Sequence, residues 1–214
     1  MPALSTTATS GGKTLRRVPI DTLVSSAEEI SQLRLLLRHG GVAAVPTETF
    51  YAIAGDPFNA DSVERIFEIK GRDEGNALPI LFASRADLDA LGVSADPAAL
   101  DIYFAIWPAP LTVVFPIRAP IAASRGLSTL AVRVPASRKL RDLLCATGPL
   151  TGTSSNRSGS PPLSDPDEIE AGFRREIDLL VDGGKTPGSL PSTVLDATRD
   201  PPVVLRRGAF LWPG

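Results

Sequence analysis

Hydroxyl groups and a carboxylate follow the first strongly apolar run of the chain. Residues 42–45 are apolar, and directly after them stands the string Pro46-Thr47-Glu48-Thr49-Phe50-Tyr51. In open α/β sheets, ligands bind at the edge where strands end, so this string predicts a binding site. The alternative is that Thr47 caps a helix, because threonine is a frequent N-cap residue.

Basic and polar side chains that suit a phosphate group occur at four further places. Lys70 and Arg72 stand at the end of a predicted helix, where the helix dipole also favours cations. Residues 153–159 lead out of a predicted strand and can donate several hydrogen bonds to phosphate, although an ordinary polar loop has the same composition. The two remaining clusters are residues 191–193 and residues 205–208.

The chain has few residues for histidine or cysteine chemistry, with one His and one Cys. His39 precedes a helix-ending glycine, and Cys145 lies among leucines of a predicted helix, where we expect it to be buried. Two Gly-Gly-Lys-Thr strings lack the glycine that a phosphate-binding loop needs six residues before its lysine. We therefore expect no internal disulfide, no cysteine-rich metal site and no Walker-type site.

Short apolar runs alternate with amphipathic stretches, which predicts strands interleaved with helices. The predicted helices run from Ser25 or Ser26 to Gly40, from Asn59 or Asp61 to Gly71, from about 97 to 106, from Ser137 to Gly148, and near 166–175. The predicted strands are residues 16–20, 42–45, 79–83, 111–117, 129–134, 150–153, 177–181, 193–196 and 203–206. This order predicts an α/β or closely mixed α+β architecture around one sheet.

The composition is that of an ordinary globular domain. The 214 residues are 43% hydrophobic and 21% charged, which excludes disorder as the main state. A net charge of −2 excludes the positive field of dedicated nucleic-acid-binding proteins. Without an apolar run that could span a membrane or serve as a signal core, we expect a cytoplasmic protein. We predict a disordered tail at residues 1–14 and a single domain at residues 15–214.

Taken together and in this order, the clusters resemble the threonylcarbamoyl-AMP synthase family, the YrdC-like enzymes, in its short single-domain form. The resemblance runs from about residue 26 to residue 208. It rests on Pro46-Thr47-Glu48-Thr49-x-Tyr51, Lys70-x-Arg72, Trp107-Pro108-x-Pro110-Leu111-Thr112, Val132-Arg133-Val134-Pro135, Ser154-x-Asn156 with Ser158-Gly159, Ser192-Thr193-Val194 and Leu205-Arg206-x-Gly208. It implies a twisted, largely mixed or antiparallel sheet flanked by helices, with a concave basic cavity.

The resemblance also implies roles for individual residues. Lys70 and Arg72 would be catalytic and would bind phosphates. L-Threonine would be bound by Thr47, Thr49, Tyr51, Arg133 and Ser192, with Arg133 a candidate for either the threonine carboxylate or a phosphate. The nucleotide would be bound by Lys70, Arg72, Thr112, Ser154, Asn156 and Arg206.

The implied reaction condenses L-threonine, bicarbonate or carbon dioxide, and ATP into L-threonylcarbamoyl-AMP and pyrophosphate, for threonylcarbamoyladenosine formation in tRNA. It needs no protein nucleophile, because the attacking carbamate is itself an anion and the protein has to align and neutralise charges. Mg²⁺ bound with ATP is the expected cofactor, without a metal site of the protein's own. The expected partner is a tRNA threonylcarbamoyl transferase complex, which would receive the product.

Two alternatives stay open. One is an RNA-binding module of the same fold, or weak RNA binding beside the activity, and the other is a paralogue that adenylates a different carbamate. Three departures from the family pattern motivate the second. Ala52 and Ala109 each stand where the family usually has glycine, and Asp73 follows the Lys70-x-Arg72 pair where proline is common.

Overall fold

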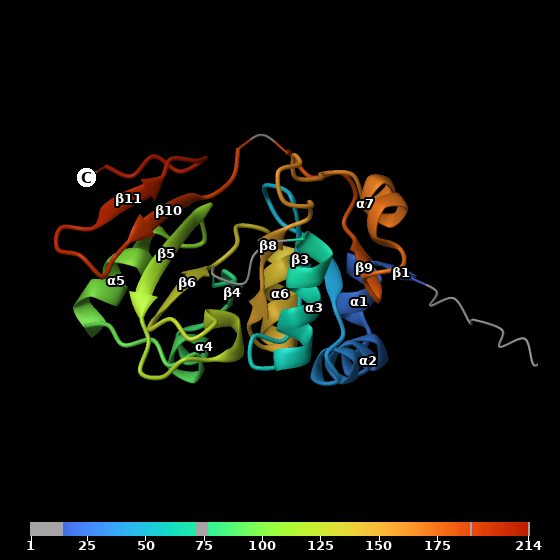
Figure 1. Ribbon diagram of the computed structural model, residues 1–214, viewed down its shortest axis with the longest axis horizontal. Helices are drawn as coiled ribbons and strands as arrows, with labels where there is room; N and C mark the ends of the chain where they lie inside the picture. Colours follow the sequence, from blue (N-terminus) through green and yellow to red (C-terminus); the bar gives the residue numbers. More distant parts are fainter. Residues whose placement is uncertain (1–14, 72–76, 189, 214) are drawn as a thin grey trace, which may run out of the picture.

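Two mixed β-sheets stand side by side at the centre of the molecule, with helices packed around them (Figure 1). The structure is a computed structural model that describes residues 15–71, 77–188 and 190–213. The predicted tail at residues 1–14 lies outside the described residues, as do Arg72 and Asp73. The mixed α/β class expected from the sequence is confirmed.

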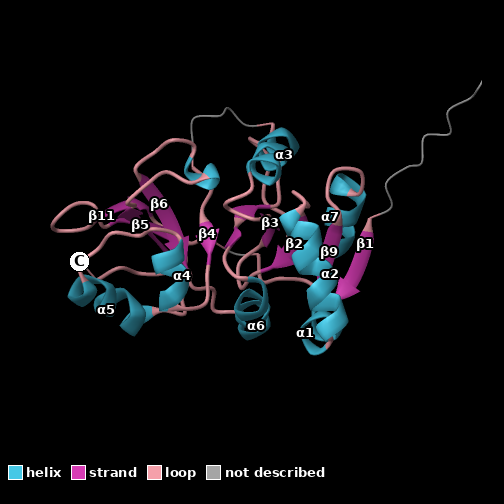
Figure 2. Ribbon diagram, turned by 90° about the horizontal axis from the view of Figure 1, so that it is seen from below, coloured by secondary structure: helices cyan, strands magenta, loops and turns pink. Residues whose placement is uncertain are grey.

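The first sheet, sheet A, is covered by helices on both faces (Figure 2). Its strand order is β1 (Arg16–Pro19), β9 (Leu179–Asp182), β2 (Ala43–Pro46), β3 (Tyr51–Ala54) and β8 (Thr153–Ser154). Helices α3 (Ala60–Lys70) and α7 (Pro166–Phe173) contribute to one core, and α1 (Ile20–Ser25), α2 (Ala27–Arg38) and α6 (Arg138–Thr147) to the other. Alternate residues of a strand point to opposite faces, so a strand buried on both faces is apolar throughout.

The second sheet, sheet B, shares one core with its own helices, and its Leu81 and Leu150 join the core that contains α6. Its order is β11 (Val203–Arg206), β10 (Thr193–Asp196), β5 (Leu111–Pro116), β6 (Thr129–Arg133), β4 (Ile80–Leu81) and β7 (Leu150–Thr151). Helices α4 (Arg85–Ala90) and α5 (Pro97–Ile106), together with the short η1 (Ala122–Ser124), belong to the core that Leu111 and Val113 join. Because side chains alternate along a strand, Thr112 projects from the opposite face.

The two sheets meet at one run of chain, predicted from the sequence as a single strand at residues 150–153. Strand β7 pairs with β4 in sheet B, and β8 pairs with β3 in sheet A. Gly152 lies between them, where a methyl group would approach the Leu81 side chain to 2.4 Å. The prediction of one sheet is therefore corrected to two sheets, because the ladder is interrupted at this glycine.

Helix ends follow the predicted capping residues. Ser26, Asn59 and Ser137 each accept a hydrogen bond from a backbone N–H in the first turn of α2, α3 and α6. Gly71 ends α3 with a φ of 56°, in the left-handed region that glycine adopts without strain. Helices α1 and α4 and strand β3 were not predicted from the sequence, and residue 20 begins α1 instead of extending β1.

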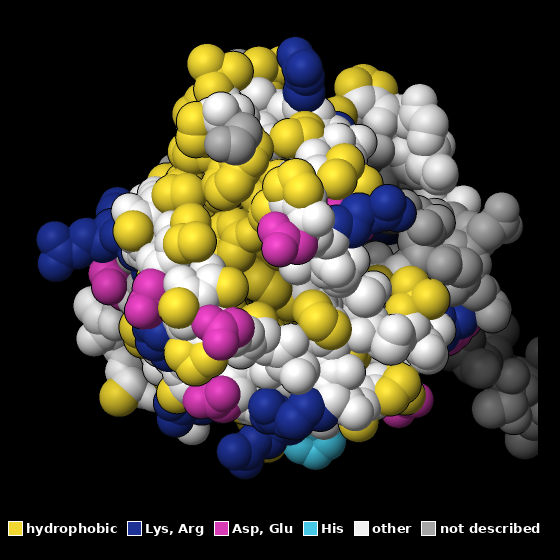
Figure 3. Space-filling model, turned by 90° about the vertical axis from the view of Figure 1, so that its left-hand side faces the viewer, with side chains coloured by type: hydrophobic (Ala, Val, Ile, Leu, Met, Phe, Trp, Pro, Cys, Tyr) yellow, Lys and Arg dark blue, Asp and Glu magenta, His cyan; other side chains and the backbone are white. Residues whose placement is uncertain are grey.

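The outer end of sheet B carries exposed apolar side chains near the edge strand β11 (Figure 3). The large apolar residues exposed on α5, β11 and the segment after β11 are Ile102, Val203, Leu205 and Leu211. Gathered apolar side chains of this kind are typical of an interaction surface. None of the helices within the described part of the chain is long and apolar enough to cross a membrane.

Candidate active site

A cavity of about 340 Å³ opens between the two sheets and is lined by residues from both. Eight of the residues predicted to bind substrate or nucleotide line it: Thr47, Thr49, Tyr51, Thr112, Arg133, Ser154, Ser192 and Arg206. They come from the β2–β3 turn and the start of β3, from β8, from the start of β5, from the ends of β6 and β11, and from the residue before β10. The volume lies in the range of small-molecule binding sites.

The turn between β2 and β3 carries two hydroxyls joined to each other. Thr47 Oγ1 donates to the Phe50 carbonyl at 2.7 Å and accepts from the Thr49 N–H at 3.0 Å. Since this uses the only proton of the Thr47 hydroxyl, Thr49 donates in the 2.9 Å contact between the two hydroxyls. The lone pairs of Thr49 Oγ1 can then accept from a ligand ammonium or hydroxyl. No helix begins at Thr47, which contradicts the capping alternative.

Tyr51 lines the cavity, but its hydroxyl binds the backbone of a neighbouring loop. The side chain is fully buried, and its hydroxyl donates to the Gly184 carbonyl at 2.8 Å and accepts from the Gly183 N–H at 3.0 Å. Burial raises the pKa of Tyr51 to about 12, so the hydroxyl stays protonated near neutral pH. Its geometry therefore suits support of the 183–184 segment better than direct contact with a substrate.

One chain of hydrogen bonds links three predicted residues on the sheet B wall. Thr112 Oγ1 lies 2.9 Å from Ser192 Oγ, and the Arg206 guanidinium donates to the Ser192 carbonyl at 2.9 Å. Parallel pairing of β10 with β5 brings these hydroxyls together. Burial, and then the positive charge of Arg133, lower the pKa of Arg206. Two arginine charges thus lie near each other, which favours the binding of an anion.

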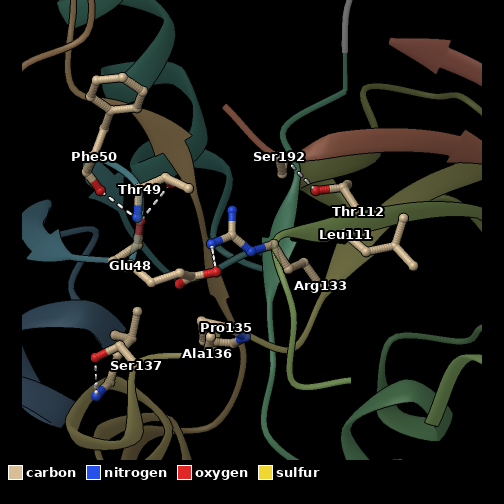
Figure 4. A network of polar contacts seen from close by, with 12 residues as sticks. Glu48, Thr49, Phe50, Leu111, Thr112, Arg133, Pro135, Ala136, Ser137 and Ser192 are labelled. Carbon is tan, nitrogen blue, oxygen red and sulfur yellow. Dashed lines mark hydrogen bonds and ion pairs between the residues drawn. The ribbon is translucent and has the colours of Figure 1, made fainter. Parts of the chain in front are cut away.

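Arg133, at the end of β6, forms an ion pair with Glu48 from the β2–β3 turn (Figure 4). The pair crosses the gap between the sheets, and the Arg133 side chain is 8% exposed. Burial lowers the pKa of Arg133, and the Glu48 carboxylate opposes that shift. The sequence analysis gives Glu48 no role of its own. The available signal is a lone carboxylate among hydroxyls directly after a buried strand.

Lys70 is buried at the end of α3 and binds the loop after β8. Its ammonium donates to the carbonyl oxygens of Ser154 at 2.5 Å and of Asn156 at 2.9 Å. The Ser154 hydroxyl donates to Asn156 Oδ1 at 2.6 Å, which tightens the same loop. The structure thus brings these three residues together, although of the three only Ser154 lines the cavity. Arg72 lies outside the described residues.

Carboxylates are scarce at this site. None of the described residues that line the cavity is acidic, and Glu48 reaches it only through Arg133. The described ranges also hold no group of three His, Cys, Asp or Glu side chains that could bind a metal ion. The described lining of the cavity therefore offers no carboxylate ligand to a divalent cation.

The two glycine-to-alanine departures occupy different kinds of backbone, Ala52 in strand β3 and Ala109 in a bend just before β5. Ala52 pairs with Val45 and Ser154 within sheet A, and Arg125 is the only non-glycine residue with a positive φ in the described chain. The Ala109 N–H donates to the Val134 carbonyl at 3.2 Å. Neither position needs the conformational freedom of glycine, so the alanines are accepted without backbone strain.

Cys145 and His39 take no part in the cavity between the sheets. Cys145 is exposed, which corrects the expectation of burial, because α6 buries the leucines at 140, 143 and 144 and the next residue turns about 100° further round the helix. It lines a separate hollow of about 460 Å³ with Arg34 and Arg38. His39 Nδ1 lies 2.8 Å from the Leu35 carbonyl at the end of α2, as expected for a helix end.

Comparison with known proteins gives one family for most of the chain. The family model described as telomere recombination, which spans Sua5, YciO and YrdC proteins, matches residues 35–208. The threonylcarbamoyl-AMP synthase of Pyrococcus abyssi is 37% identical over 177 residues, which are 81% of this chain and 52% of that protein. The synthase of Coxiella burnetii (strain RSA 493) is 36% identical over 165 residues, which are 75% of this chain and 88% of that protein.

Solved structures give the same result. P. abyssi Sua5 complexed with L-threonine superposes with a TM-score of 0.79 at 33% identity, over 91% of this chain and 57% of that chain. Escherichia coli YciO superposes with a TM-score of 0.75 at 29% identity, over 86% of this chain and 90% of that chain. The chain spans little more than half the length of the synthases of P. abyssi and Bacillus subtilis.

Proposed function

Because the chain belongs to the Sua5/YciO/YrdC family, we propose that it makes L-threonylcarbamoyl-AMP from L-threonine, bicarbonate or carbon dioxide, and ATP. Relatives in Pyrococcus abyssi, Bacillus subtilis and Coxiella burnetii are named threonylcarbamoyl-AMP synthase, and one matched structure is described as complexed with L-threonine. In this proposal the chain is an ATP-dependent nucleotidyltransferase that releases pyrophosphate. Its product serves threonylcarbamoyladenosine formation in tRNA.

The observation that carries the proposal is the contrast between the two walls of the cavity. Arg133 and Arg206 stand on the sheet B side, and the hydroxyls of Thr47 and Thr49 stand on the sheet A side. A site of this kind suits a ligand that combines anionic groups with an ammonium or hydroxyl donor. Threonine together with ATP has this combination of groups.

In this proposal, L-threonine is bound by the hydroxyls of Thr47 and Thr49 together with Arg133 and Ser192. The Thr49 hydroxyl has lone pairs for the ammonium or hydroxyl of threonine, and Arg133 has guanidinium N–H groups for its carboxylate. Thr47 orients Thr49 through the 2.9 Å contact between their hydroxyls. Tyr51 supports the site from behind, because its hydroxyl is bound to Gly183 and Gly184.

Nucleotide binding falls to Thr112, Ser154 and Arg206, which line the same cavity. Lys70 and Asn156 act on this group through the loop after β8, whose carbonyl oxygens the Lys70 ammonium binds. The phosphate-binding role of Arg72 stays a prediction from the sequence. A cation beside phosphoryl oxygens stabilises the charge that develops during transfer.

The chemistry then needs alignment more than covalent catalysis. The threonine ammonium gives up two protons to water and its nitrogen bonds to the carbon of carbon dioxide, which gives a carbamate. A carbamate oxygen attacks the α-phosphorus of ATP, the bond from that phosphorus to the β-phosphate bridging oxygen breaks, and pyrophosphate leaves. Arg206 neutralises phosphoryl charge while Arg133 holds the threonine carboxylate. A Mg²⁺ ion brought in with ATP would supply further charge neutralisation.

The product is a mixed anhydride that water hydrolyses, so the proposal includes transfer to a tRNA threonylcarbamoyl transferase complex. A cytoplasmic location follows from this role. The alternative functions are RNA binding by the same fold and adenylation of a different carbamate.

Pyrophosphate release from purified protein with ATP, threonine, bicarbonate and magnesium tests the proposal. We expect release that depends on threonine and falls in Lys70→Ala. Release no greater than in that variant rejects the proposal. Release with another amino acid in place of threonine identifies a paralogue with a different carbamate substrate.

A further inference from the structure

The ion pair between Glu48 and Arg133 is the one contact in Figure 4 that joins the two walls of the cavity across the gap. Glu48 comes from the turn after β2, and Arg133 ends β6, 85 residues further along the chain. Their side chains are 18% and 8% exposed. A buried pair of charges is weak evidence for stability, because desolvation of both ions offsets their attraction. Its presence between the walls therefore calls for a different explanation.

The pair is incomplete on both sides. Glu48 Oε1 accepts from one terminal nitrogen of Arg133, while Glu48 Oε2 and Arg133 Nε are buried without a hydrogen-bond partner among the described residues. An arginine–carboxylate pair selected for its own strength would use two parallel N–H···O bonds. Buried polar atoms without partners are uncommon, so this geometry serves something other than the pair itself.

The direction of the other terminal nitrogen of Arg133 indicates what this one-sided geometry serves. In Figure 4 it points away from Glu48, toward the space between Thr49 and Ser192. Arg133 also lines the cavity with these two residues. Glu48 thus binds one end of the guanidinium fork and leaves the other end directed at the site.

We propose that Glu48 is a positioning residue, which holds Arg133 so that its second terminal N–H₂ group receives the substrate carboxylate. The inference rests on the proposed function and deepens it. A free arginine side chain has much rotamer entropy to lose on binding, and one held in place loses less.

The opposite role is that Glu48 occupies the place of the substrate carboxylate and has to be displaced. The two roles predict opposite signs. Removal of the charge weakens threonine binding if Glu48 positions Arg133, and strengthens it if Glu48 competes with the substrate.

Titration of L-threonine into Glu48→Gln by calorimetry, without ATP, distinguishes the roles. Glutamine keeps the shape and one neutral acceptor, so the fold should survive. We expect the Kd for threonine to rise about five- to tenfold, as when a charge-assisted hydrogen bond becomes a neutral one. The Kd for ATP and the melting temperature should stay close to wild type. Glu64→Gln, which breaks an ion pair with Arg125 outside the cavity, is the matched control.

The same substitution in an Arg133→Met background tests whether Glu48 acts through Arg133. In that background, Glu48→Gln should change the Kd for threonine by less than about twofold. An unchanged or tighter Kd in the single variant overturns the inference, and so does an equal loss in both backgrounds. If wild type itself binds no threonine, both the proposed function and this inference are rejected. Threonine binding by wild type with no effect of Glu48→Gln rejects the inference alone.

Discussion

Replacement of Tyr51 by phenylalanine separates two roles of this residue, contact with substrate and support of the site. The variant loses a hydroxyl that donates to the Gly184 carbonyl and accepts from the Gly183 N–H. Each neutral hydrogen bond contributes about 1 kcal/mol, so the free energy of unfolding should fall by about 2 kcal/mol. Both glycines are exposed, so water can replace the lost partner and no larger penalty applies.

Thermal and urea unfolding measure this loss. For a domain of this size, about 2 kcal/mol lowers the melting temperature by about 4 to 8 °C. Tyr103→Phe is the matched control. Tyr103 is also buried, and no hydrogen bond of its hydroxyl is found among the described residues. We expect that variant to differ from wild type by less than about 0.5 kcal/mol.

Calorimetric titration of threonine is the second readout. The Kd of Tyr51→Phe should stay within about twofold of wild type, because the lost hydroxyl points at backbone and not at the substrate. A variant as stable as wild type refutes the reasoning about the hydrogen bonds. A variant that keeps its stability but loses threonine binding shows direct contact with the substrate, as the sequence predicted.

Four further predictions concern the loop after β8, the junction of the sheets and the pH dependence. Lys70→Ala should lower kcat/KM about 30- to 1000-fold, or about 2 to 4 kcal/mol, and a wild-type rate would show that catalysis does not depend on the loop contacts of this ammonium. Asn156→Ala should raise the KM for ATP more than the KM for threonine, and steady-state kinetics with the reverse order would contradict the assignment. Gly152→Ala should lower the melting temperature through a clash worth about 1 to 3 kcal/mol, whereas Gly172→Ala, with open space around it, should not. In the folded protein the pKa of Tyr51 is raised to about 12, so the protonated hydroxyl contributes its full stabilisation below about pH 10. In urea titrations, the free energy of unfolding of wild type should therefore fall relative to that of Tyr51→Phe between about pH 10 and 12.

Local sequence signals predicted the helices and strands that have both a regular spacing of apolar residues and a residue that marks where the element begins or ends. Helix α5 spans the predicted residues because Asp96 caps it and Trp107-Pro108 ends it. Strands β10 and β11 also have the predicted bounds. Strand β3 was missed because it is buried on both faces, so it lacks the alternation that marks a half-buried strand. Helices α1 and α4 were missed because six residues give too few turns for a period.

The predicted site residues converge because several stand where strands end, which is a local property. The contacts between them are not local. The bond from Lys70 to the carbonyl of Asn156 joins residues 86 apart, and the pair of Glu48 with Arg133 depends on how two sheets pack. A single sequence contains no signal for that packing. The direction of the Tyr51 hydroxyl likewise depends on a loop that lies more than a hundred residues away.

The order of strands in sheet A determines when this chain can fold during synthesis. Strand β9 lies between β1 and β2, so the earliest strands lack their central neighbour until residue 182 has left the ribosome. Strand β2 can pair with β3 as soon as both are made, but β1 and the edge of β2 that faces β9 stay unpaired through most of translation, and such edges promote aggregation. Contacts so distant along the chain also make folding slow. Ribosome stalling before β9 should therefore yield chaperone-bound or aggregated chains. In these chains the sheet A wall of the cavity, which carries the hydroxyls of Thr47 and Thr49, has not formed.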